Sequence, residues 1–266
     1  MRRALTYAAV AVVTVTLAAG CDSGSPEPAA APPSVPSTAP ASTPTTAPPS
    51  TEPAPTASPT PKPTASPKPQ KLKSGVKGPR VVALQERLTA LGYWNGKADG
   101  TFGGQTQQAV YALQKAAGLG RDGVVGPKTQ KALDQGVRPK AKSTSGRVIE
   151  INLKRQLLML VDDGKVTEVF NTSTGSMENY EQNGSTYLAD TPSGKFRVSR
   201  QIDGWRHAPL GLLWRPKYFN GGIAVHGANS VPPYPASHGC ARLSIKAMNY
   251  LWTNDKIPIK TRVWVY

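Results

Sequence analysis

The chain has 266 residues and a formal net charge of +16 at pH 7, from 32 lysines and arginines against 16 acidic residues. It holds only two cysteines, which excludes a disulfide-rich scaffold. Such an excess of positive charge in a cytoplasmic protein would indicate nucleic-acid binding. The first twenty residues, however, indicate that the chain is exported from the cytoplasm.

Residues 1–20 have the features of a secretory signal. Two arginines precede an apolar run that is too short and too small in side chain to be a convincing membrane span. The run ends in Leu17-Ala18-Ala19-Gly20-Cys21, which resembles a bacterial lipoprotein cleavage box, with the leucine one position further from the cysteine than usual. This resemblance implies lipidation of Cys21 and anchoring at the outer face of the cytoplasmic membrane. The alternative is an ordinary signal peptide cut nearby.

Residues 21–70 read as a disordered linker. Positions 22–70 contain 16 of the 26 prolines, interleaved with Ala, Ser and Thr, so no apolar core can form there. Such a segment favours polyproline II and acts as a tether or an inert spacer. For an exported chain, the expected partners of the positive charge are anionic wall polymers and lipid head groups, and nucleic acid is not expected.

Residues 71–138 contain an internal repeat. Ala83-Leu84-Gln85 recurs as Ala112-Leu113-Gln114, and two Asp-Gly loops follow the two copies. The first copy is longer by a six-residue loop around Tyr93-Trp94-Asn95-Gly96. Apolar residues at helical spacing predict three short helices in a small bundle.

The repeat resembles the peptidoglycan-binding module found on many wall-active bacterial enzymes. The paired leucine-glutamine helices and the loops around Asp99-Gly100 and Asp122-Gly123 carry the resemblance. It implies a groove between helices that holds glycan or stem peptide. The alternative reading is that these aspartates and glycines only cap helices and make turns.

Residues 146–266 read as mainly β, a sandwich or small barrel. Alternating and continuous apolar runs predict strands, and Asp162-Asp163-Gly164 predicts a hairpin turn. The expected strands are 148–153, 156–161, 165–171, 194–202, 212–218, 222–226 and 261–266, with one helix at 244–254. The fold class is therefore multidomain, a small three-helix bundle followed by a mainly-β domain.

The chemistry concentrates between His226 and Leu243. Cys240 is preceded by His226 and His238, and Gly227 and Gly239 allow backbone to approach a ligand closely. A nearby imidazole is expected to lower the pKa of the thiol. If Cys21 is acylated, Cys240 has no disulfide partner, and a lone thiol in an oxidising compartment indicates nucleophilic catalysis. Zinc binding by the same three side chains is the weaker alternative, because no Cys-x-x-Cys or His-Glu-x-x-His spacing is present.

Four blocks in this segment resemble the signature of the L,D-transpeptidase catalytic domain over essentially all of residues 146–266. In chain order they are Ser173-Thr174-Gly175, Thr191-Pro192-Ser193-Gly194-Lys195-Phe196, Val225-His226-Gly227 and Ser237-His238-Gly239-Cys240-Ala241-Arg242-Leu243. The chain departs from the family pattern at Ala241, where a bulky aliphatic residue is usual, and in a shorter gap between His226 and Ser237.

The resemblance implies acyl transfer through a thioester without a cofactor. Cys240 would attack the third residue of a tetrapeptide stem and expel D-alanine, and the amine of a second stem would then take the acyl group. His226 would be the base, oriented by the carbonyl of Gly227, with His238 supporting the loop or the thiolate. Backbone N–H groups around Gly239 and Cys240 would hold the oxyanion.

Substrate contacts are expected from Ser237 and Gly239 and from three larger side chains. Arg242 would hold a substrate carboxylate or an acidic partner within the fold, while Tyr218 and Trp214 either wall the cleft or belong to the core. The resemblance also implies acylation by carbapenem-type β-lactams. The alternatives are an L,D-carboxypeptidase of the same fold and a non-catalytic wall-binding lipoprotein.

Overall fold

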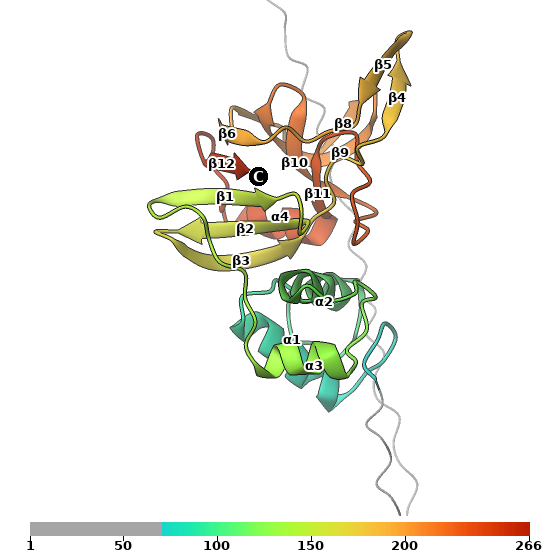
Figure 1. Ribbon diagram of the computed structural model, residues 1–266, viewed down its shortest axis with the longest axis vertical. Helices are drawn as coiled ribbons and strands as arrows, with labels where there is room; N and C mark the ends of the chain where they lie inside the picture. Colours follow the sequence, from blue (N-terminus) through green and yellow to red (C-terminus); the bar gives the residue numbers. More distant parts are fainter. Residues whose placement is uncertain (1–70) are drawn as a thin grey trace, which may run out of the picture. The chain divides into compact units, whose positions relative to one another are not determined.

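The computed structural model describes residues 71–266, so the signal segment, Cys21 and the linker lie outside the described residues. Three helices come first, α1 (Pro79–Ala90), α2 (Gly104–Ala117) and α3 (Pro127–Asp134), as the sequence predicts (Figure 1). Prolines begin α1 and α3, where the missing N–H costs no helical hydrogen bond. Within residues 71–266 no helix is long and apolar enough to cross a membrane.

The repeated glutamine clamps the loop that follows it. In the first copy, Gln85 Nε2 donates to Asp99 Oδ1 at 2.9 Å and to Thr106 Oγ1 at 3.0 Å. Its Oε1 accepts from the Gly100 N–H at 2.9 Å. The buried amide thus satisfies both of its ends within one loop.

The second copy repeats this arrangement. Gln114 Nε2 donates to Asp122 Oδ1 at 2.6 Å and to Thr129 Oγ1 at 3.2 Å, and its Oε1 accepts from the Gly123 N–H at 3.0 Å. The Asp-Gly motif therefore makes turns, which was the alternative to ligand binding given for these aspartates and glycines.

Two sheets form the mainly-β part. The first has the order β3-β2-β1-β12-β6, in which β1 and β12 are parallel. Its strands are β1 (Arg147–Asn152), β2 (Leu157–Asp162), β3 (Lys165–Asn171), β6 (Gly194–Arg197) and β12 (Arg262–Val265).

The second sheet has the order β11-β10-β9-β7, with β8 paired to β9. Its strands are β7 (Arg200–Gln201), β8 (Trp205–Ala208), β9 (Gly211–Asn220), β10 (Ile223–Ala228) and β11 (Ala241–Ser244). A separate hairpin pairs β4 (Asn179–Gln182) with β5 (Ser185–Leu188), and α4 (Ile245–Thr253) begins at Ser244, whose Oγ accepts from the Ala247 N–H.

A shared core joins the two sheets and α4, which confirms the sandwich prediction. Ile149 and Leu158 of the first sheet belong to one apolar cluster with Val225 and Leu243 of the second and Met248 of α4. The sequence missed β4, β5, β8 and β11, and the single strand expected at 194–202 is two short strands in different sheets. Strands β4 and β5 are exposed on both faces, so they carry no apolar alternation for a pattern to detect.

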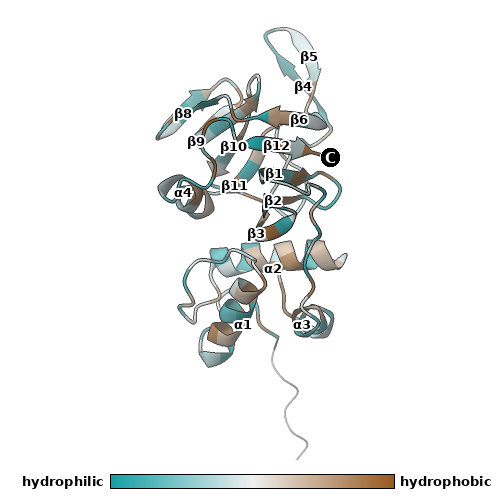
Figure 2. Ribbon diagram, turned by 90° about the vertical axis from the view of Figure 1, so that its left-hand side faces the viewer, coloured by the Kyte–Doolittle hydropathy of each residue, from teal (hydrophilic) through white to brown (hydrophobic). Residues whose placement is uncertain are grey.

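Strand β2 is buried on both of its faces. Leu158 and Leu160 point into the sandwich, whereas Leu157, Met159 and Val161 belong to the apolar cluster of the helical module. Helix α2 lies directly against β2 and β3 (Figures 1 and 2). The continuous apolar run in β2 therefore reflects a sheet layered between helices and a second sheet.

The six-residue loop that distinguishes the first repeat pairs with the edge of β3. The Val169 N–H donates to Gly92 O at 2.8 Å, and the Trp94 N–H donates to Val169 O at 3.0 Å. The Trp94 ring stacks on Phe170 at 5.9 Å between centroids and lies 5.6 Å from Tyr250 of α4. The loop thus covers a sheet edge that would otherwise present unpaired backbone groups.

Replacing Met159 by alanine tests whether α2 buries this face. Met159 is 1 % exposed, so Met159→Ala should lower the free energy of unfolding by about 2–5 kcal/mol, measured by urea denaturation. Met177, which is 63 % exposed, provides a matched control whose alanine variant should lose less than about 0.5 kcal/mol. Equal effects of the two variants would contradict the burial of β2 against α2.

Candidate active site

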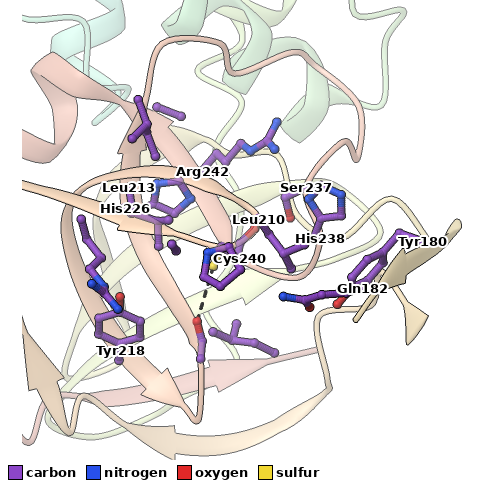
Figure 3. A pocket seen from close by; sticks show the side chains of 18 of the residues that line it. Tyr180, Gln182, Leu210, Leu213, Tyr218, His226, Ser237, His238, Cys240 and Arg242 are labelled. Atoms are coloured by element: carbon purple, nitrogen blue, oxygen red, sulfur yellow. Dashed lines mark hydrogen bonds between the residues drawn. The ribbon is translucent and has the colours of Figure 1, made fainter. Parts of the chain in front are cut away.

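Parallel pairing of β10 with β11 brings the two ends of the chemical stretch together. His226 on β10 lies opposite Arg242 on β11, and Cys240 immediately precedes β11. A cavity of about 830 Å³ opens at this point and is lined by Cys240, His226, Ser237 and Arg242, among others (Figure 3). The structure thus brings the predicted thiol and imidazole into one cavity.

His226 is held in one orientation by its own strand. The ring is 4 % exposed, and its Nδ1 lies 2.9 Å from Gly227 O. Because a carbonyl only accepts, Nδ1 carries the hydrogen and Nε2 is left as the acceptor. Burial lowers the pKa of His226 to about 4, so the imidazole is neutral at pH 7. This is the orientation that the family resemblance implies.

The Cys240 thiol differs from the expectation of a lowered pKa. Burial raises the pKa of this thiol above its ordinary value, although the Ala224 N–H, 3.4 Å from Sγ, and the Arg242 charge act in the opposite direction. Both members of the pair are therefore neutral at rest near pH 7. A neutral thiol becomes an effective nucleophile only when a base such as a neutral imidazole accepts its proton.

Ser237 fixes the turn that presents the thiol. Its Oγ donates to Cys240 O at 2.6 Å and accepts from the Gly239 N–H at 3.0 Å. Thr191 Oγ1 donates to Gly239 O at 2.6 Å and accepts from the Gly175 N–H at 2.9 Å. Three of the four sequence blocks therefore meet around this turn, and Thr191 is a member to which sequence reasoning assigned no role.

Gly239 has no room for a side chain. Its φ is +137°, and a Cβ there would lie 2.7 Å from Asp190 O. Its N–H, expected to face the oxyanion, instead donates to Ser237. Among residues 71–266 the structure shows no acceptor for the N–H groups of His238 and Cys240, which leaves these two as the free donors of the turn.

His238 lies at the rim of the cavity. Its ring is exposed and meets Tyr180 of β4 edge to face, with centroids 4.8 Å apart (Figure 3). Tyr180 and Gln182 line the same cavity, and sequence reasoning missed both because they lie on an exposed hairpin without an apolar pattern. No group of three or more His, Cys, Asp or Glu side chains arranged to hold a metal occurs within residues 71–266.

Arg242 and Tyr218 line the cavity as expected, and Trp214 does not. The Arg242 guanidinium makes no hydrogen bond or ion pair with residues 71–266, and burial lowers its pKa. Tyr218 is 4 % exposed and carries the Arg200 guanidinium 3.7 Å from its ring centroid. Trp214 packs at the back of the site, where its indole N–H donates to Asn249 Oδ1 at 2.6 Å.

The packing of Trp214 explains the glycine that follows His226. A Cβ on Gly227 would lie 2.9 Å from the Trp214 ring and 3.1 Å from Met248 of α4. Gly227 therefore serves twice, because its carbonyl orients His226 and its missing side chain admits Trp214.

Comparison with family models agrees with this layout. Residues 77–133 match a peptidoglycan binding domain, and residues 146–265 match the L,D-transpeptidase catalytic domain. The fold is thus that of a transpeptidase catalytic domain that follows a peptidoglycan-binding module.

A solved structure narrows this class to a family. The L,D-transpeptidase of Xylanimonas cellulosilytica is 56 % identical, covers 76 % of this chain and all of that one, and superposes with a TM-score of 0.74. The chain belongs to the L,D-transpeptidase family and is an enzyme of the cell wall.

Curated relatives match over shorter stretches. The N-acetylmuramoyl-L-alanine amidase CwlL of Bacillus licheniformis is 48 % identical over 79 residues, which are 29 % of this chain and 22 % of that protein. A spore cortex-lytic enzyme of Bacillus cereus is 31 % identical over 128 residues, 48 % of each chain. The chain thus spans between about a fifth and a half of the length of these relatives.

The neutral resting pair predicts how Cys240 alkylation depends on pH. Because the pKa of the thiol is raised and that of His226 is near 4, the thiolate fraction at Cys240 should still be increasing at pH 9. The rate of iodoacetamide labelling, followed at the Cys240 peptide by mass spectrometry, should rise through this range. A plateau already reached below pH 7 would instead indicate a preformed thiolate–imidazolium pair.

Proposed function

We propose that the chain cross-links the third residues of two peptidoglycan stem peptides through a thioester on Cys240, with release of D-alanine. The observation that carries the proposal is the single cavity that holds the Cys240 thiol together with a buried, neutral His226 whose Nε2 is free to accept a proton.

In the first step the thiol attacks the carbonyl of the third stem residue. His226 takes the thiol proton as the C–S bond forms, and the imidazolium then donates a proton to the departing amine of D-alanine. The C–N bond breaks and leaves the acyl group on sulfur. In the second step the amine of another stem attacks the thioester carbonyl and loses a proton to His226. The new C–N bond forms as the C–S bond breaks, and the imidazolium returns the proton to sulfur, which restores the thiol.

The free N–H groups of the cysteine turn fit the charge that develops on the carbonyl oxygen. Cys240 and His238 each supply one such donor, held in place by the hydrogen bonds of Ser237. Each preorganised donor is worth about 3 kcal/mol in acyl-transfer enzymes. This assignment replaces the Gly239 N–H with that of His238.

Arg242 suits a carboxylate of the stem peptide. Its guanidinium lines the cavity without a partner among the described residues, and a planar guanidinium can bind a carboxylate through two parallel hydrogen bonds. Tyr180 and Tyr218 line the same cavity as the thiol. Carbapenem-type β-lactams are proposed to acylate the same sulfur, because they present a comparable carbonyl.

The location of the enzyme is proposed from the residues that lie outside the described range. The signal of residues 1–20 and the cysteine box at Cys21 support export and lipid anchoring at the outer face of the cytoplasmic membrane. The net charge of +16 supports attraction to anionic wall polymers and lipid heads.

Mass spectrometry of the full-length chain with a purified disaccharide-tetrapeptide tests the proposal. The expected product is a dimer that has lost one D-alanine; it should be absent with Cys240→Ala and unchanged with Cys21→Ala, which alters the only other cysteine. Monomeric tripeptide alone would identify a carboxypeptidase. Neither product, with no adduct on Cys240 after carbapenem treatment, would refute catalysis by this thiol.

Substitution of Arg242 separates binding from chemistry. Arg242→Gln should raise KM for the tetrapeptide about tenfold or more, because a charge-assisted hydrogen bond contributes about 1.5–3 kcal/mol, while kcat should change little. Arg206→Gln is the control, since Arg206 also lines the cavity but is exposed on β8. A fall in kcat with unchanged KM would argue against carboxylate binding by Arg242.

A further inference from the structure

Helix α2 carries a buried lysine that has no acidic partner. Lys115 is 2 % exposed, and its Nζ donates to Gln156 O at 2.9 Å, to Thr172 O at 3.0 Å and to Asn171 Oδ1. Burial lowers its pKa to about 6, which expresses the free-energy cost of keeping a cation there. A methionine of similar length would leave Thr172 O and Asn171 Oδ1 without this donor, whereas Gln156 O would keep the Thr172 N–H at 3.2 Å.

The oxygens that Lys115 binds belong to the segment that supports the cysteine turn. Asn171 ends β3, and Thr172 directly precedes the block Ser173-Thr174-Gly175. Thr172 Oγ1 donates to Arg242 O at 2.9 Å, and Thr174 O accepts from the Ser237 N–H at 2.9 Å. Lys115 therefore binds the same segment, residues 171–174, that is hydrogen-bonded to both ends of the cysteine turn.

A second contact runs from α2 to the loop over the cavity. Gln108 Nε2 donates to Val231 O at 3.1 Å, and Gln108 Oε1 accepts from Asn171 Nδ2 at 2.5 Å. Asn171 Nδ2 also donates to Val231 O at 3.2 Å. Gln108, Asn171 and the carbonyl of Val231 thus form a closed triangle of hydrogen bonds.

Loop 229–236 is the shortened connection between His226 and Ser237. Asn229 and Ser230 line the cavity, and beyond Val231 the loop is also fastened by Arg121 Nη1, which donates to Pro233 O at 2.9 Å. In this way the helical module holds the loop at two carbonyls, Val231 and Pro233, before the chain enters the cysteine turn.

We propose that helix α2 is a positioning element of the active site, in which Gln108 and Lys115, acting through Asn171 and loop 229–236, set the placement of Cys240. The peptidoglycan-binding module then has a second role besides binding a ligand, because it positions residues of the catalytic site. The inference rests on the proposed role of Cys240 as the nucleophile. Gln108 and Lys115 touch no reacting atom, so they act only through the residues they bind.

Alanine substitution of two neighbouring glutamines in the full-length chain tests this proposal. Gln108→Ala should lower kcat about tenfold with KM within about threefold, and should slow carbapenem acylation of Cys240 by a similar factor. Gln107→Ala is the matched control, since Gln107 lies on the same helix and its side chain makes no hydrogen bond within residues 71–266, and it should behave as the parent chain.

The readouts separate positioning from folding and from the proposed function. A lower unfolding midpoint for Gln108→Ala, with kcat and acylation rate unchanged for the folded molecules, would show a purely structural role and overturn the inference. A parent chain that forms no acyl adduct would refute the nucleophile itself, which is a separate outcome.

Asn171→Asp provides a second variant that keeps the buried lysine paired. The carboxylate still accepts from Lys115, but it has no N–H for Gln108 Oε1 or Val231 O, so the two hydrogen bonds that Asn171 donates are lost. The direct bond from Gln108 Nε2 to Val231 O remains. The unfolding midpoint should stay near that of the parent chain, while kcat should fall by a smaller factor than in Gln108→Ala. Parental kcat in this variant would contradict the proposed route from α2 to Cys240.

Discussion

The double burial of strand β2 is the constraint on which the rest of the structure depends. Alternate side chains of one strand enter two different cores, because Leu158 and Leu160 face the second sheet while Leu157 and Met159 face the helices. Neither core is complete without this strand. A module that the sequence sets apart as a separate domain is therefore one of the three layers of a single structure, and the loop around Trp94 secures it to the edge of the sheet.

In the site, hydrogen bonds between side chains and backbone groups do most of the positioning. A carbonyl orients His226, the Ser237 hydroxyl fixes the turn before Cys240, and Thr191 links that turn to a neighbouring segment. Among residues 71–266 no carboxylate forms a hydrogen bond or ion pair with the imidazole. Burial disfavours charge on both the thiol and the imidazole, so both groups are neutral near pH 7.

Local patterns in the sequence predicted the features that depend on local chemistry. The glutamine repeat, the three helices, the first hairpin and the orientation of His226 by Gly227 follow from spacing or from family resemblance, and the structure contains all of them. The apolar run of β2 correctly predicted a strand, but the run does not specify that α2 covers one of its faces. That information lies in contacts between residues about fifty positions apart.

What the sequence did not reveal depends on tertiary surroundings. The direction of the Cys240 pKa follows from how deeply the thiol is buried, and the engagement of the Gly239 N–H follows from the rotamer of Ser237. Tryptophan is a residue type that often lines a substrate cleft, yet the indole of Trp214 donates to Asn249 of α4 and lies at the back of the site. The exposed hairpin β4–β5 has no apolar period, so nothing in its pattern marks Tyr180 as a neighbour of His238.

The helical module is packed against the β-sandwich as one of its layers, so the two parts keep a fixed spacing. The helices lie at a fixed distance and angle from Cys240, because Gln108 and Arg121 of the helical module donate directly to the loop that borders the thiol. An enzyme with a hinged binding domain would sample many stems around one anchoring point. If the chain forms cross-links as proposed, this fixed arrangement would set the spacing between a glycan bound to the helices and the new cross-link.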